Sequence, residues 1–406
     1  MTVSPESDRR NGRVYLVNYL LIFLAAPVMY VGVIQAALCN KLGASATVAS
    51  LPASVHLLGQ IAPLFFSWLV PHRYEQRVVI WANAMTAFLL GCVMLTLLLP
   101  VSDAIRLLAV ILQGLLQGLS GSVSLVFMVH CLRRGTTPEG QALALKKTYT
   151  AGPVTAVAGS LGAQYLLGSG RLGYPLDFAL IYAVGALCVV GVAVSSTRFV
   201  LPPVEEQART GLLAYLTAGA RQFFDNRSLR RLWFAYALWW CTLGGISNLS
   251  LFTREAVGRD PKELSGFVLA VRFGCKAIGG YFLGLIAMRS GMRAAVIGTA
   301  CLVGAGMLWA LLVPGYGYVF AFGLLGAGEL GGAYFPNYVA SLSTVGAGTR
   351  NLAILTLATP AASFAPAMHG YLTDRIGFYA SFIFGIVTAA AAVALLLSSR
   401  GRKEQE

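Results

Sequence analysis

The sequence predicts an all-α integral membrane protein with twelve transmembrane helices in two pseudo-symmetric six-helix halves. Three observations support this fold class. Hydrophobic residues make up 57% of the chain and charged residues only 11%, long apolar segments recur along it, and basic residues gather in alternate connections. An ordinary globular protein carries roughly 25% charged residues. Because polar side chains are too few to cover the apolar ones in water, a soluble domain, a coiled coil, collagen and a disordered chain are excluded.

Twelve segments are long and apolar enough to cross the hydrocarbon core as helices, which takes about 20 residues. Backbone polar groups in lipid must pair within the chain, and the sequence has no series of period-2 segments typical of barrel strands. The first segment follows three arginines, but it is too long for a signal peptide and lacks a clear cleavage site. The expected spans are 14–37, 45–71, 78–99, 106–131, 148–168, 177–200, 231–253, 263–288, 294–313, 317–342, 351–372 and 378–398.

The distribution of basic residues predicts the orientation of these spans. With the N-terminus in the cytoplasm, cytoplasmic segments carry 21 of the 30 Lys and Arg residues and external segments carry 7. This bias follows the positive-inside rule. The net charge of +14 therefore reflects topology and does not indicate nucleic-acid binding. We expect a multi-pass protein of the plasma (inner) membrane with both termini in the cytoplasm.

One connection, 201–230, is much longer than the others. It separates an N-terminal six-helix half, 1–200, from a C-terminal six-helix half, 231–406. Leucine, tyrosine and phenylalanine alternate with arginine in it, a pattern that predicts an amphipathic helix on the cytoplasmic leaflet. We interpret the segment as a linker, with a regulatory role as the alternative. A weak internal repeat, 114–121 against 323–330, supports two related halves.

Short motifs occupy the loops after the second and eighth expected spans. The later loop follows the order of the signature G-x-L-x-D-R-x-G-R, and the earlier loop carries arginines at matching places. The candidate gating residues are Arg73, Arg77, Arg289, Gly291 and Arg293. His72 and Met288 stand where the signature has an acid.

With these motifs, and with Gln113-Gly114 and Gly152-Pro153 in the fourth and fifth spans, the chain resembles the major facilitator superfamily (MFS) of secondary transporters. The resemblance covers nearly the whole chain. It implies the MFS fold, in which two halves expose a midplane site to each side of the membrane in turn. The sequence has no P-loop, which argues against an ATP-driven pump.

Three ionisable residues fall at mid-membrane, where each costs about 2.5–3.5 kcal/mol on insertion scales and so marks a functional candidate. Lys276 lies 13 residues after Glu263, and Glu329 lies 12 residues after Gly317, so both are near the midplane. Arg272 lies four residues before Lys276 and therefore on the same helix face.

Three interpretations of this group remain open. A Lys276–Glu329 ion pair would leave Arg272 as a spare cation for a carboxylate or phosphate of the substrate, which a guanidinium binds with a planar fork of donors. Alternatively, Glu329 takes up and releases a proton that drives transport. The third interpretation is a buried pair that only locks two helices together.

Polar and aromatic residues on spans that line the cavity of MFS proteins complete the candidate set. A helix–helix hydrogen bond or an interfacial anchor is the alternative for each of them. They are Tyr30, Gln113, Gln117, Trp240, Asn248 and Asn337, together with His56 in the second span.

These patterns predict a secondary active transporter that moves a small, anionic organic solute by alternating access with ion coupling. A multidrug-type efflux antiporter and a transporter-like receptor without flux are the alternatives. We expect no enzyme activity, because no catalytic constellation is present, and no cofactor or metal, with H⁺ as the candidate coupling ion. The expected partners are the solute and the lipid bilayer, without nucleic acid, and the expected state is a monomer.

Overall fold

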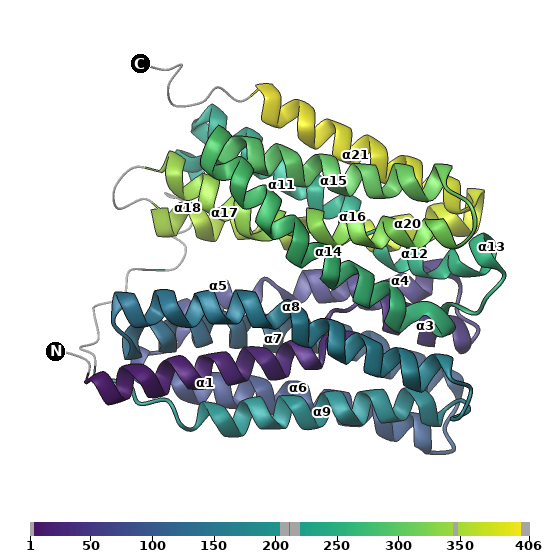
Figure 1. Cartoon of the computed structure of the whole chain (residues 1–406), viewed down its shortest axis with the longest axis horizontal. Helices are drawn as coiled ribbons and strands as arrows, with labels where there is room; N and C mark the ends of the chain where they lie inside the picture. The colour runs from purple at the N-terminus through teal and green to yellow at the C-terminus, as the bar shows by residue number, and fades with distance from the viewer. Residues whose placement is uncertain (1–3, 204–210, 212–219, 344–347, 399–406) are drawn as a thin grey trace. The chain divides into compact units, whose positions relative to one another are not determined.

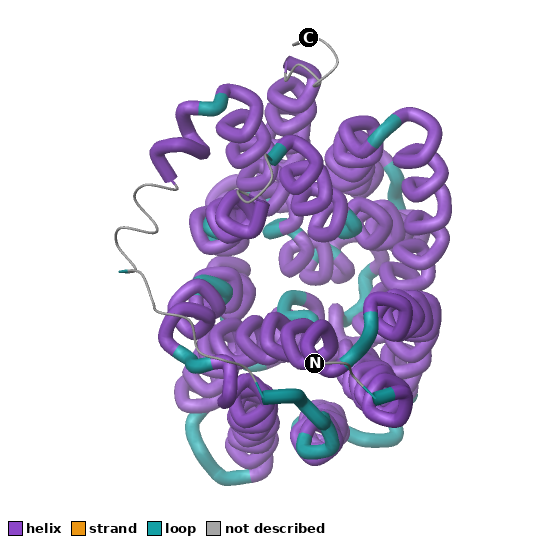
Figure 2. The backbone as a smooth tube through the Cα atoms, turned by 90° about the vertical axis from the view of Figure 1, so that its left-hand side faces the viewer, coloured by secondary structure: helices purple, strands orange, loops and turns teal. Residues whose placement is uncertain are grey.

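The computed structural model describes residues 4–203, 211, 220–343 and 348–398. Within these ranges the chain forms α-helices, two short 3₁₀ helices and connecting loops, without any strand (Figures 1 and 2). The described residues divide into two compact units. Unit 1 comprises Met1–Gly43, Gly59–Arg209 and Lys262–Ala270, and unit 2 comprises Ala44–Leu58, Thr210–Pro261 and Val271–Glu406.

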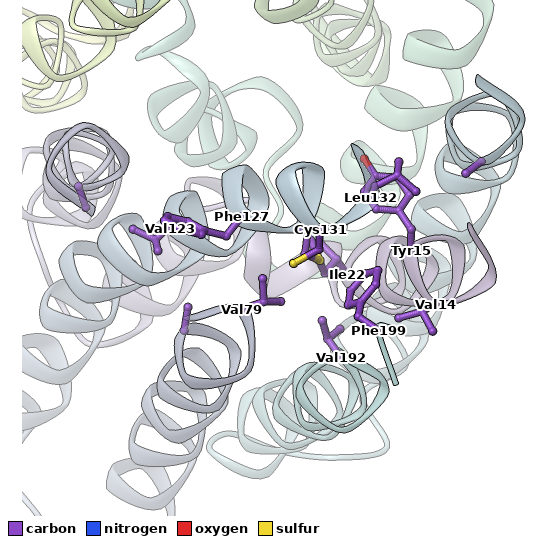
Figure 3. Packing of buried hydrophobic residues seen from close by; sticks show 14 residues of the cluster. Val14, Tyr15, Ile22, Val79, Val123, Phe127, Cys131, Leu132, Val192 and Phe199 are labelled. Carbon is purple, nitrogen blue, oxygen red and sulfur yellow. The ribbon is translucent and has the colours of Figure 1, made fainter. Parts of the chain in front are cut away.

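Unit 1 is a helical bundle around one aliphatic and aromatic core. α6 packs against α7 and α9, and α1 packs against α8 and α9. Figure 3 shows the core, in which Ile22, Phe127 and Val192 meet from three different helices. The helices of unit 1 are α1 (Pro5–Leu24), α2 (Ala26–Met29), α3 (Val33–Lys41), α5 (Ala62–Leu69), η1 (His72–Tyr74), α6 (Glu75–Leu98), α7 (Asp103–Gly135), α8 (Pro138–Gly168), α9 (Leu176–Ser196) and the first part of α14 (Pro261–Ser290).

Unit 2 is a second helical bundle, in which α15 packs against α16 and α21, and α11 packs against α21. It includes most of α4, although α4 precedes most of unit 1 in the sequence. Its helices are α4 (Ala46–Gly59), α11 (Arg227–Leu243), α12 (Ile246–Leu251), α13 (Thr253–Val257), the remainder of α14, α15 (Met292–Leu312), η2 (Gly315–Val319), α16 (Phe320–Gly328), α17 (Gly331–Leu342), α18 (Gly348–Thr356), α19 (Ala358–Ala361), α20 (Ala365–Ile376) and α21 (Phe378–Ser398).

The structure confirms the all-helical membrane architecture but does not establish twelve spans. Among the described residues, 8 helices are long and apolar enough to cross a membrane. The expected spans 14–37, 231–253 and 317–342 are each divided into shorter helices, and 148–168 lies within the 31-residue helix α8. The amphipathic helix expected in 201–230 falls mostly outside the described residues. Within this segment the structure describes 201–203, 211 and 220–230, and 220–225 is helical.

Candidate functional site

The three charged residues expected at mid-membrane form one cluster in unit 2. Arg272 donates hydrogen bonds from its guanidinium to Oε1 of Glu329 in very short contacts. Lys276 Nζ lies 3.3 Å from the other carboxylate oxygen, Oε2. The side chains of Arg272 and Glu329 are only 7% and 8% exposed. We call Arg272, Lys276 and Glu329 the charged triad.

A break in the expected tenth span positions the carboxylate of the charged triad. α16 ends at Gly328 and α17 begins at Gly331, so Glu329 stands in the turn between two helical segments. Its backbone N–H still bonds to Leu325 O at 2.8 Å. α16 also approaches α14 closely, because a Cβ atom at Gly326 would collide with the carbonyl oxygen of Arg272. The close approach brings Glu329 within reach of both cations.

The pairing corrects one detail of the sequence-based hypothesis. Arg272 is not a spare cation beside a Lys276–Glu329 pair, because its long guanidinium side chain reaches the same carboxylate and makes the closer contact. Two cations share one anion, which leaves a formal charge of +1 on the charged triad. Guanidinium and ammonium groups at such a site are suited to bind a carboxylate or a phosphate.

A second group of predicted site residues meets in unit 1. Gln113 donates to Gln117 in a short hydrogen bond, and Gln117 Nε2 donates to Met29 O at 2.9 Å. Tyr30 follows Met29 directly, at the end of α2. The two glutamines therefore support a break in the first expected span and lie beside Tyr30.

The other predicted binding residues are dispersed in unit 2. Asn248 is buried in α12 and donates to Ser50 Oγ at 3.2 Å. Trp240 is half-buried with its ring centroid 5.0 Å from that of Trp239. His56 is half-buried on α4, whereas Asn337 is exposed on α17.

The predicted gating residues lie at the ends of helices. Arg73 and Arg77 are exposed and flank the ring of Tyr74, with guanidinium carbons 4.7 and 5.4 Å from its centroid. Arg293 donates to the carbonyl oxygen of Leu397 at 2.7 Å, near the end of α21. Gly291 has φ +86°, a backbone conformation that favours glycine, and Arg289 nearby is exposed.

Sequence analysis missed a buried carboxylate beside the first gating loop. Glu75 is the first residue of α6, and Arg134 Nη1 lies 2.8 Å from it. His72 Nδ1 and His130 Nδ1 lie 2.9 and 3.4 Å from the same carboxylate. An acidic residue at the start of an apolar span was the available signal. Glu75 lies three residues after His72, which stands where the loop signature has an acid.

Two further carboxylates were also missed as partners. Asp177, fully buried in unit 1, accepts from Lys262 Nζ at 2.9 Å. Asp374 in unit 2 accepts from the backbone N–H groups of Ala46 and Thr47, both at 2.9 Å, and so caps the first turn of α4. No sequence spacing joins residues that are far apart in the chain, so these pairs had no local signal.

Among the described residues there is no cluster of His, Cys, Asp and Glu able to hold a metal ion. No protein-family model matches the sequence, and no curated protein matches it. Solved structures match at the level of the fold.

Three of these solved structures illustrate the likeness. The D-xylose-proton symporter is 10% identical, with TM-score 0.71, covering 98% of this chain and 99% of that chain. The nucleoside transporter NupG is 13% identical, with TM-score 0.68, covering 95% of this chain and 98% of that chain. The human organic anion transporter MFSD10 is 18% identical, with TM-score 0.64, covering 97% of this chain and 100% of that chain.

The chain therefore has the fold of MFS-type transporters, as its motifs suggested, and it is an integral multi-pass membrane protein. These solved proteins are transporters. Their names refer to a sugar, to nucleosides and to organic anions, so the shared fold does not select a substrate.

Proposed function

We propose that the protein is a secondary active transporter that moves a small organic anion across the membrane by alternating access, coupled to protons. The observation that carries the proposal is the charged triad, in which Glu329 at a helix break pairs with the buried Arg272 and the half-buried Lys276. Broken helices are typical of substrate and ion sites in secondary transporters.

The charged triad supplies a physical route to coupling. While Glu329 is ionised, its carboxylate occupies the donors of Arg272 that a substrate carboxylate or phosphate would use. Protonation of Glu329 removes that competitor and raises the local positive charge. Proton binding and anion binding therefore favour each other, and by linkage the effect is reciprocal.

The proposal extends to the setting of the transporter. The bias of 21 basic residues against 7 supports an inner (plasma) membrane protein with both termini in the cytoplasm. We also propose six-helix halves, 1–200 and 231–406, a linker, 201–230, and a monomeric state. No cofactor is required for this function, and the coupling ion is H⁺.

Flux measurements in proteoliposomes test the proposal. Solutes are first screened by thermal stabilisation of the purified protein, and those that stabilise it are tested as radiolabelled substrates with and without an imposed pH gradient. We expect saturable uptake of carboxylated or phosphorylated solutes that a pH gradient drives. Binding without flux would show a receptor, and flux insensitive to pH would exclude proton coupling.

Two variants at one position separate coupling from packing. In Glu329→Gln the side chain keeps its size but cannot titrate, so we expect pH-driven accumulation to be lost. Glu329→Asp is the matched control, because it retains a carboxylate, and we expect it to retain a pH response at a lower rate. Unchanged pH dependence in Glu329→Gln would refute proton coupling through this residue.

A multidrug-type efflux antiporter is the second candidate. An aromatic group in unit 2 favours it, with the rings of Tyr236 and Trp239 stacked at 5.5 Å and Phe335 4.8 Å from Tyr236. This candidate predicts outward transport of several unrelated amphipathic cations. The positive formal charge of the charged triad favours the anion transporter instead.

A further inference from the structure

Aromatic side chains follow one side of α1 in unit 1. Tyr15, Tyr19 and Phe23 recur every four residues, so they lie above one another on one helix face. Ring centroids of Tyr15 and Tyr19 are 4.7 Å apart, and those of Tyr19 and Phe23 are 6.1 Å apart. Tyr30, beyond α2, stacks on Phe23 at 6.3 Å with an interplanar angle of 23°.

The turn that carries Tyr30 is held by side-chain amides. After α2 the backbone turns at Gly32, whose φ of +147° favours glycine. Gln35 Nε2 donates to Val28 O at 3.0 Å, and Gln117 Nε2 donates to Met29 O at 2.9 Å. These bonds replace helical partners that the break removes. Gln117 is therefore a positioning residue for Tyr30.

α8 brings a fifth aromatic side chain to this group. Tyr149 lies within electrostatic range of the phenol groups of Tyr19 and Tyr30. The approach of α8 depends on Gly152, where a Cβ atom would collide with the ring of Phe23. Tyr149 is 65% exposed, and Tyr19, Phe23 and Tyr30 are half-buried. We call Tyr15, Tyr19, Phe23, Tyr30 and Tyr149 the tyrosine face.

Packing alone does not account for four phenol groups. Phenylalanine fills the same space without a hydroxyl, and buried tyrosine hydroxyls normally have hydrogen-bond partners. The fully buried Tyr15 hydroxyl lies beside Tyr19, yet it makes no hydrogen bond of normal geometry within the described residues. Figure 3 shows the side chain of Tyr15 with its hydroxyl on the side away from Val192 and Phe199.

We propose that the tyrosine face binds an aromatic ring of the transported solute, with the phenol groups hydrogen-bonding to polar atoms on that ring. Stacked and tilted tyrosines offer planar surfaces, and the hydroxyls offer donors and acceptors at their edges. The inference concerns unit 1 alone and rests on the proposed transport function. It predicts that the substrate carries an aromatic ring in addition to an anionic group.

Matched probe molecules test the ring and the charge separately. Benzoate and phenyl phosphate are compared with cyclohexanecarboxylate and cyclohexyl phosphate, which keep the charge and replace the aromatic ring. Benzamide keeps the ring and removes the charge. Apparent Kd values come from thermal stabilisation of the purified full-length protein over a concentration series. We expect the aromatic probes to bind about 2- to 10-fold more tightly than their saturated partners.

Two exposed tyrosines on α8 provide the variant and its control. Tyr149→Ala removes a member of the tyrosine face and should abolish the preference for aromatic over saturated probes. Tyr165→Ala removes a tyrosine that is 55% exposed and lies near Arg171, outside the tyrosine face. We expect that control to keep the preference. Tyr30→Phe, which keeps the ring, should retain most of it.

The outcomes separate this inference from the proposed function. Equal binding of aromatic and saturated anions, including no binding of either, would overturn the role of the tyrosine face. A ring preference that survives Tyr149→Ala, or that is lost equally in Tyr149→Ala and Tyr165→Ala, would overturn it as well. Equal binding of benzoate and benzamide would instead contradict the anion site, while leaving the ring preference to stand.

Discussion

Each unit contains a helix break beside its candidate site residues, and these two breaks are stabilised in opposite ways. In unit 1, Gln35 and Gln117 satisfy the free carbonyls with neutral amides beside Tyr30. In unit 2, the break presents the carboxylate of Glu329 to two cations. In the transporter that we propose, unit 1 recognises the solute by shape and unit 2 binds it by charge.

Removing the carboxylate of Glu329 in unit 2 should cause the largest loss of stability. Glu329→Ala removes the common anion of the buried Arg272 and the half-buried Lys276. Loss of one partner from a buried ion pair costs about 3–5 kcal/mol. The free energy of unfolding, measured in mixed micelles with increasing denaturing detergent, should fall by about that amount.

A charge-free variant checks the origin of that loss. Arg272→Met/Lys276→Met/Glu329→Met removes all three charges, and we expect it to unfold close to the wild-type midpoint, because apolar replacement of a buried ion pair is often neutral. It should bind no anionic solute. Comparable instability in both variants would mean that packing, and not charge, determines stability here.

Replacing a glycine at a close helix contact by alanine should lower stability less than Glu329→Ala does. The loss should be similar in the two units. A Cβ atom at Gly159 would meet Leu24 O in unit 1, and one at Gly326 would meet Arg272 O in unit 2. Overpacking costs about 1–3 kcal/mol, so Gly159→Ala and Gly326→Ala should each destabilise the fold by this amount.

The control for Gly159 is Gly162 on the same helix, α8, and the control for Gly326 is Gly274 on α14, the helix that Gly326 approaches. A Cβ atom at Gly162 or Gly274 would meet nothing within 4 Å. Alanine there should raise stability slightly, by about 0.5–1 kcal/mol, because it lowers the entropy lost by the backbone. Equal effects in variants and controls would show that the close approaches are not required. A deficit confined to Gly326→Ala would show that unit 2 depends more strongly on its charged contact.

Length and composition predicted much of the fold, because the free energy of placing a helix in lipid depends mainly on which residues it contains. The expected spans 78–99 and 294–313 agree with α6 and α15 to about one turn of helix. Breaks inside spans escaped prediction, since the chain is apolar enough on both sides of Glu329 to be taken for one span. The close approach of α14 and α16 at Gly326 is a tertiary contact that the sequence does not reveal.

The same limit applies to the candidate sites. The depth and helix face of Arg272, Lys276 and Glu329 could be predicted from spacing, but the sharing of one carboxylate by both cations could not. Gln117 was recognised as a polar residue in an apolar span. Its role in holding Met29 required knowledge that the first span is broken, and that follows from contacts between α2 and α7.

Breaking an exposed ion pair in unit 1 should have the smallest effect on stability among these changes. Asp103, whose side chain is 60% exposed, lies 2.9 Å from Arg106 Nη1. Arg106 also donates to the carbonyl oxygens of Thr96 and Leu99, both at 3.2 Å, so it keeps partners when the carboxylate is removed. Asp103→Asn should therefore lower stability by less than about 1 kcal/mol, and added salt should reduce the difference. A loss as large as that of Glu329→Ala would contradict the view that burial, and not pairing as such, makes the charged triad of unit 2 energetically important.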